Sequence, residues 1–331
     1  MRFAGLVLGT TLLVQAGYSP QAGFLQAPIV RRPPSAQGPQ APQGKDDQVP
    51  TIKVETRLVN VAVNVVDAKG APVGGLGRDD FEILEDGKVQ KIAYFEKESV
   101  TPLSIVLAID ASESVLRDER LEKNAAKHFV RALLRDQDEL DLMQFADSVR
   151  EIVSFTNQKK RIESGLEDLQ RGDATALYDA IYLGSDRLAG TSAADGRRRV
   201  LVLITDGEDT VKGSRYGQAL EEAQRAGAMV YSLIIVPVAA DAGRNTGGEH
   251  ALIQMAEDTG GKYYYVEDPQ DLEPALAHVS DDLRTQYVLG YYAPHGGGDS
   301  SFRKIRVRMK DPELQGKFKV RHRSGYYADA R

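Results

Sequence analysis

Five oxygen-bearing side chains in this sequence have the types and the spacing that a divalent cation needs. Three of them, Asp110, Ser112 and Ser114, alternate along one short segment and supply a carboxylate and two hydroxyls. A hard cation such as Mg²⁺ prefers about six oxygen ligands in octahedral geometry. The segment could therefore supply about half of the ligands of one metal ion. Neighbouring loops must supply the remaining ligands.

Thr175 and Asp206 are the candidates for those ligands. Thr175 lies where a loop meets a predicted helix, and Asp206 follows the apolar run 200–204 as Asp110 follows the run 103–109. Parallel strands present their carboxyl ends at one edge of a sheet, so we expect these loops to converge there. The predicted ion is Mg²⁺, with Mn²⁺ or Ca²⁺ as alternatives. Its predicted ligands are Asp110, Ser112, Ser114, Thr175 and Asp206.

Three more acidic residues, Glu113, Glu208 and Asp209, lie beside the predicted ligands. We expect them to support the ligands or to face a partner. A competing interpretation is that Ser112 and Ser114 only cap a helix and that the aspartates shape turns. Capping alone would not place carboxylates after two separate buried strands, which favours the metal site.

The elements that must position these residues alternate between strands and helices. Short apolar runs predict strands, and apolar residues at helical spacing predict the helices between them. This alternation predicts a doubly wound, mostly parallel sheet covered on both faces. The strands are expected at 103–109, 140–145, 149–155, 200–204, 229–236 and 262–266, and the helices at 118–135, 177–188, 214–226, 249–258 and 268–283.

Both flanks of this α/β region have β patterns. The first flank predicts about four strands and the second about three, with in–out alternation at 54–66, 287–292, 305–309 and 318–322. Each flank alone would leave an apolar face and open edges in water. We therefore predict one immunoglobulin-like β-sandwich made from both flanks, with the α/β region inserted. Two separate β modules flanking that region are the alternative.

The predicted ligands resemble the metal-ion-dependent adhesion site of von Willebrand factor A domains. In that family a D-x-S-x-S loop, a threonine and a distant aspartate share one divalent ion, and all five positions match here. The resemblance covers about residues 101–284. It implies a Rossmann-like α/β fold and an ion that accepts the Glu or Asp side chain of a partner protein.

The flanks carry a narrower resemblance, to von Willebrand A-related secreted proteins of acidobacteria. It extends the match to roughly residues 53–328. It implies no particular activity. The motifs are Leu58-Val-Asn-Val-Ala-Val, Asp79-Asp-Phe-Glu, Glu85-Asp-Gly-Lys, Tyr287-Val-Leu-Gly-Tyr-Tyr and Gly325-Tyr-Tyr.

Two classes of function remain, a metal-dependent protein-binding module and a metal-assisted hydrolase that uses the same ion. The chain has no Cys and no H-E-x-x-H pair, which argues against Cys-based catalysis and a zinc protease. The only evident general bases are the three acids beside the ligands. The sequence therefore favours the binding module and predicts no enzyme.

The N-terminus predicts export. Arg2 and the apolar run after it are typical of a cleaved signal peptide, and the Pro-rich stretch that follows is typical of a linker. The net charge of −6 argues against a nucleic-acid partner, and no stretch suits a stable membrane span. We predict a secreted or periplasmic protein. Its expected segments are a signal peptide 1–22, a linker 23–50, the first half of the β-sandwich at 51–100, the A domain 101–284 and the second half of the β-sandwich at 285–331.

Overall fold

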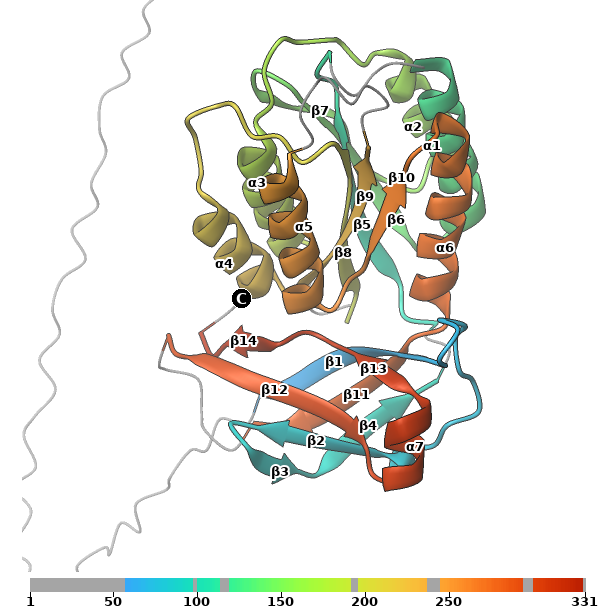
Figure 1. The fold of residues 1–331 in the computed structure, drawn as a ribbon, viewed down its shortest axis with the longest axis vertical. Helices are drawn as coiled ribbons and strands as arrows, with labels where there is room; N and C mark the ends of the chain where they lie inside the picture. Colours follow the sequence, from blue (N-terminus) through green and yellow to red (C-terminus); the bar gives the residue numbers. More distant parts are fainter. Residues whose placement is uncertain are drawn as a thin grey trace, which may run out of the picture. The chain divides into compact units, whose positions relative to one another are not determined.

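The computed structural model describes residues 57–97, 100–113, 119–191, 196–236, 245–293 and 300–329. These residues all lie within one unit, Lys53–Arg331. We call residues 103–284 the α/β part, and residues 57–97 with 287–327 the β part (Figure 1). The predicted signal peptide and linker lie outside the described residues. Among the described helices, none is long and apolar enough to cross a membrane.

A six-stranded sheet in the order β10-β9-β8-β5-β6-β7 forms the centre of the α/β part. All neighbouring strands are parallel except β7, which runs antiparallel to β6 at the sheet's edge. The predicted α/β fold with a mostly parallel sheet is therefore confirmed. The strands are β5 Leu103–Asp110, β6 Glu139–Phe145, β7 Val149–Thr156, β8 Arg198–Thr205, β9 Ala228–Ile235 and β10 Tyr263–Val266.

Helices cover both faces of this sheet. Every residue of β5 is buried, because alternate side chains enter two different hydrophobic clusters. α1, α2 and α6 pack in one cluster, and α3, α4 and α5 pack in the other. The helices are α1 Glu119–Leu133, α2 Lys159–Glu167, α3 Leu177–Ala189, α4 Tyr216–Ala226, α5 Thr246–Thr259 and α6 Leu272–Arg284.

The β part consists of two four-stranded sheets, β13-β1-β11-β4 and β14-β12-β2-β3. Strands from before and after the α/β part pair antiparallel in both sheets, β1 with β11 and β2 with β12. Alternate valines of β1 and the inward residues of β2, β11 and β12 share one core. The strands are β1 Leu58–Val66, β2 Phe81–Glu85, β3 Lys88–Gln90, β4 Ile92–Glu96, β11 Tyr287–Tyr292, β12 Phe302–Met309, β13 Lys319–Arg321 and β14 Gly325–Tyr327.

Several short elements were not predicted from the pattern. α2 buries only Ile162, Gly165 and Leu166, too few apolar residues for a clear helical period. The helix α7, Pro312–Lys317, has no buried residue and depends on Asp311, whose side chain accepts a hydrogen bond from the Glu313 N–H. The second flank also has four strands rather than three, because the short β14 pairs with β12.

Candidate metal centre

Asp110 is the last residue of β5 and lies beside the end of β8. The two strands are parallel and in register, with Ile109 opposite Ile204, so the next residues are Asp110 and Thr205. The Thr205 hydroxyl donates to Asp110 Oδ2 at 2.7 Å, and the Ser112 N–H donates to Asp110 Oδ1 at 3.0 Å. Both carboxylate oxygens are therefore held in place by the chain itself.

The Asp110 carboxylate is fully buried and has no ion pair with any described Lys or Arg. The pKa of Asp110 is raised to about 6, mainly by burial and to a smaller extent by the nearby Asp206 carboxylate. The hydrogen bonds from Ser112 and Thr205 lower this pKa but do not offset the effect of burial. A buried anion without a cation is unfavourable, and its ionised form requires a positive charge. This is the environment that a bound divalent cation would stabilise.

Thr175 is buried on the loop that precedes α3, and its backbone is joined to the loop after β8. The Thr175 N–H donates to the Thr210 hydroxyl at 2.8 Å, and the Thr210 N–H donates to the Thr175 carbonyl at 2.9 Å. These two bonds keep the Thr175 loop next to the loop that carries Asp206.

The Thr175 loop is also joined to the loop after β5. Ser112 forms an isolated parallel bridge with Gly172, in which the Gly172 N–H donates to the Ala111 carbonyl at 3.1 Å. A side chain at Gly172 would collide with Ala146 and Asp147, so glycine permits the close approach of this loop to the loop after β6. Three loops are thus connected at the carboxyl edge of the sheet.

Asp206 follows β8 and is nearly buried. Its Oδ1 accepts a hydrogen bond from the Glu208 N–H at 3.1 Å, which leaves the other oxygen without a partner in the described chain. The next residue, Gly207, has φ +83° and lies against Gly248 at the start of α5. A left-handed backbone in a tight space favours glycine there.

The structure therefore brings four of the predicted ligands, Asp110, Ser112, Thr175 and Asp206, into connected loops. Ser114 lies outside the described residues. The three acids beside the ligands differ from one another in their surroundings. Glu113 is exposed and Glu208 is half-buried. Asp209 accepts a hydrogen bond from the Tyr178 N–H at 3.2 Å, so it holds the first turn of α3, and burial raises its pKa.

Thr205 and Thr210 are functional candidates that sequence reasoning missed. The Thr205 hydroxyl orients Asp110 and accepts a hydrogen bond from the Gly207 N–H at 3.1 Å. Thr210 holds the Thr175 loop. The available signal was their position, because they flank the acidic loop that begins with Asp206.

The donor set fits a hard cation that binds oxygen. It consists of carboxylates and hydroxyls and has no nitrogen or sulfur, as Mg²⁺, Mn²⁺ and Ca²⁺ prefer. In the part of the chain that the structure describes, no three His, Cys, Asp or Glu side chains cluster closely enough to hold a metal. An ion here would therefore need the hydroxyl ligands as well as Asp110 and Asp206.

Comparison with known proteins identifies the family of this chain. Residues 104–278, more than half of the chain, match the family described as the von Willebrand factor type A domain. A human protein, calcium-activated chloride channel regulator 4, is 27% identical over 173 residues. That match covers 50% of this chain but only 17% of the human protein.

Several solved structures are similar at low identity. Proximal thread matrix protein 1 from the mussel byssus, in a structure described as having a zinc-occupied MIDAS motif, is 18% identical with a TM-score of 0.45. The match covers 56% of this chain and 49% of that one. The pilus adhesin SpaC from Lactobacillus rhamnosus GG is 13% identical with a TM-score of 0.45 and covers 75% of this chain and 47% of that one.

Proposed function

We infer the function of this chain from the family to which it belongs, that of the von Willebrand factor type A domain. Domains of this family commonly act in protein–protein interaction and are generally not enzymes. We propose that the chain is an exported protein-binding module whose binding depends on one divalent ion. The proposed ligands of that ion are Asp110, Ser112, Ser114, Thr175 and Asp206.

The observation that carries this proposal is the buried Asp110 carboxylate, which has no cation in the described chain and lies near Asp206. When bound, a divalent ion would supply positive charge to both carboxylates and attract a further carboxylate. Two aspartates nearly neutralise such an ion, and serine and threonine hydroxyls complete its shell without adding charge. We therefore propose that a Glu or Asp side chain of the partner protein completes the site. Mg²⁺ is the proposed ion, with Mn²⁺ and Ca²⁺ as alternatives.

The surroundings of the possible general bases favour protein recognition over hydrolysis of a small substrate. Asp209, one of the possible general bases, is already engaged at the start of α3.

Three further features remain proposals. We propose that the chain is secreted or periplasmic through a cleaved signal peptide. We propose that the β part is an immunoglobulin-like sandwich into which the α/β part is inserted. The proposed boundaries are 1–22, 23–50, 51–100, 101–284 and 285–331. The pairing of β1 with β11 and of β2 with β12 supports the insertion.

Titration calorimetry of the full chain with Mg²⁺ and Mn²⁺ tests the metal site. We expect one site per chain, lost in Asp110→Ala. Asp173→Asn is the matched control, since Asp173 is an exposed acid two residues before Thr175 whose backbone N–H, not its side chain, makes the recorded hydrogen bond. Unchanged affinity in Asp110→Ala would contradict the ligand assignment.

A pull-down from an envelope extract tests the binding function. We expect the wild-type chain to retain a protein with Mg²⁺ and to release it with EDTA, and Asp110→Ala to retain none. Metal-dependent cleavage of the captured protein would instead favour the hydrolase.

A further inference from the structure

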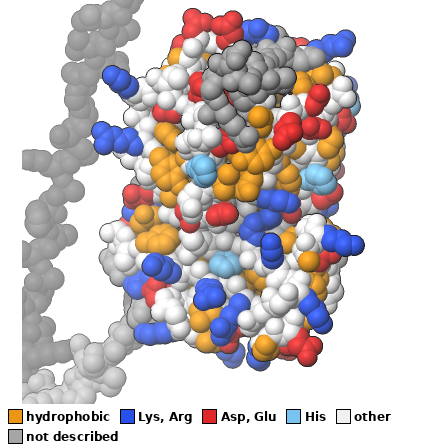
Figure 2. Space-filling view, in the orientation of Figure 1, with side chains coloured by type: hydrophobic (Ala, Val, Ile, Leu, Met, Phe, Trp, Pro, Cys, Tyr) orange, Lys and Arg blue, Asp and Glu red, His pale blue; other side chains and the backbone are white. Residues whose placement is uncertain are grey.

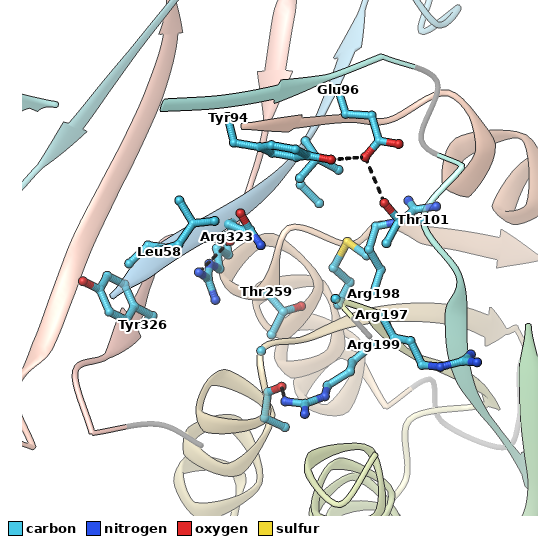
Figure 3. Close-up of a pocket in the computed structure, with 18 of the residues that line it drawn as sticks. Leu58, Tyr94, Glu96, Thr101, Arg197, Arg198, Arg199, Thr259, Arg323 and Tyr326 are labelled. Atoms are coloured by element: carbon cyan, nitrogen blue, oxygen red, sulfur yellow. Dashed lines mark hydrogen bonds between the residues drawn. The ribbon is translucent and has the colours of Figure 1, made fainter. Parts of the chain in front are cut away.

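A cavity of about 680 Å³ lies between the α/β part and the β part, at the end of the central sheet opposite the proposed metal site. Its α/β wall comes from the first residues of β8 and β9 and from the end of α4. Its other wall comes from β1, β4 and the segment before β14 (Figure 3). The cavity therefore lies at the amino ends of the parallel strands.

Arginine is the main charged residue of this cavity, and three of its six arginines either form an ion pair or donate to several carbonyls. Arg199 donates to the Ala226 carbonyl at 2.8 Å and to the Thr191 carbonyl at 3.0 Å, so it binds the carbonyls that follow α3 and end α4. Arg225 pairs with Glu221 and Asp329, and Arg197 lies 3.9 Å from Glu139. These three need no ligand to explain them.

The other three, Arg57, Arg198 and Arg323, form no ion pair with any described acidic side chain, and Arg57 makes one hydrogen bond, to the Ala328 carbonyl at 3.2 Å. Arg198 is only 7% exposed and donates through Nη1 to the Leu283 carbonyl, while its Nε and Nη2 are buried without a partner. Arg323 donates to the Asn60 carbonyl at 2.8 Å, and its Nε is also buried without a partner. Unsatisfied donors of this kind are rare in proteins.

The electrostatics of the cavity are positive. Glu96 is the one carboxylate among the described residues that line it, and its Oε2 already accepts hydrogen bonds from the Tyr94 and Thr101 hydroxyls (Figure 3). Burial lowers the pKa of Arg198 to about 10, and burial and the neighbouring Arg57 lower the pKa of Arg323. Four guanidiniums of the cavity, those of Arg57, Arg198, Arg199 and Arg323, have no ion pair in the described chain, and Glu96 is the one carboxylate opposite them. The cavity therefore keeps an excess of positive charge, and a buried charge without a partner, as at Arg198, is costly.

The cavity also offers apolar surface to a ligand. Leu58, Tyr94 and Val100 line it and are 38%, 41% and 67% exposed, which is high for apolar side chains. Such side chains next to guanidiniums suit a ligand with an apolar body and anionic groups. In the face shown in Figure 2, basic side chains gather over the β part and near its junction with the α/β part, and acidic side chains are more frequent over the α/β part.

We propose that this cavity binds a small organic dianion, with phosphate or carboxylate groups for Arg57, Arg198 and Arg323 and an apolar or aromatic body for the exposed Leu58 and Tyr94. Guanidinium groups bind both kinds of anion through paired N–H donors. The ligand would contact both parts of the molecule and stabilise their junction. The site is separate from the proposed metal centre and needs no metal.

Calorimetry of the full chain with naphthyl phosphate and naphthalene dicarboxylate tests the proposal, with naphthol as the neutral control. We expect at least one of the two dianions to bind with one site per chain, more weakly at high salt, and naphthol not to bind. The stronger dianion identifies the anionic group that the site prefers. If neither dianion binds at millimolar concentration, the proposal is wrong.

Charge variants locate the site. Arg323→Gln and Arg57→Gln should each weaken dianion binding about tenfold, since a hydrogen bond to a charged group is lost. Glu96→Gln should strengthen binding, because it removes the opposing charge and keeps an acceptor for Tyr94. Arg306→Gln is the matched control, an exposed arginine of β12 outside the cavity. Equal weakening in Arg306→Gln and Arg323→Gln would show a general charge effect and overturn the proposal.

Discussion

The two ends of the central sheet carry opposite uncompensated charges. At the carboxyl end, the Asp110 carboxylate is buried without a cation in the described chain, and at the amino end Arg198 is buried without an anion there. The carboxyl-end residues are aligned by the register of β5 and β8 and by bonds between neighbouring loops. The amino-end charges come together only where the β part packs on the α/β part. The geometry of the first site is therefore set by the sheet, and that of the second is set by the packing of the β part on the α/β part.

The largest expected effect is that a substitution at one end of the central sheet changes ligand binding at that end and not at the other. Asp110→Ala should abolish Mg²⁺ binding and leave dianion binding unchanged, because Asp110 is absent from the cavity lining. Arg323→Gln should weaken dianion binding about tenfold and leave Mg²⁺ binding unchanged. Calorimetry of both variants with both ligands checks this, and a loss of both affinities in either variant would contradict the separation.

A second prediction concerns the stability of the metal-free chain. The folded-state pKa of Asp110 is about 6 and its ordinary value is 3.8, so ionising this buried group opposes folding. Asp110→Asn should therefore raise the free energy of unfolding by ~2–3 kcal/mol at pH 7 in EDTA.

That gain depends on pH with a definite sign. The cost of the ionised carboxylate is fully present above pH 6 and disappears below 3.8, where Asp110 is protonated in both the folded and unfolded chain. Urea unfolding at pH 7, 5 and 3.5 should show the advantage of Asp110→Asn shrinking at each step. A constant difference between the two proteins would refute the role of burial.

A smaller effect is expected from the hydroxyl that holds Asp110. Thr205→Val keeps the shape of the side chain but removes its bonds to Asp110 and Gly207, which should cost about 1–2 kcal/mol of stability and weaken Mg²⁺ binding. Thr205→Ser restores the hydroxyl and should recover most of the metal affinity. Full affinity in Thr205→Val, measured by calorimetry, would show that Asp110 needs no such support.

The smallest effect concerns the backbone after Asp206. Gly207→Ala places a side chain at φ +83° and within 3.2 Å of Gly248, so we expect a loss of about 1 kcal/mol. Gly217→Ala is the matched control, since Gly217 is exposed in α4 with nothing within 4 Å and no positive φ. In thermal unfolding experiments, we expect Gly207→Ala to lower the Tm and Gly217→Ala not to lower it.

Local patterns were sufficient to predict most of the central fold. β5 is buried along its whole length. Its run of apolar residues is both the pattern that predicts the strand and the surface that the fold buries. The positions of Asp110 and Asp206 after two such runs placed both carboxylates at one edge. The helix α7 was missed because it buries no residue and depends on a single capping residue.

The strands of the α/β part, its helices except α2, and the candidate ligands at its carboxyl edge could be read from the amino-acid sequence, because short-range periodicity and strand ends are local features. The support from Thr205, the capping role of Asp209 and the arginine cavity became visible only in three dimensions. Arg323 bonds to the carbonyl of Asn60, which lies 263 residues away in the chain. No local pattern encodes such a contact, since it exists only after strands from both flanks have paired and packed against the sheet.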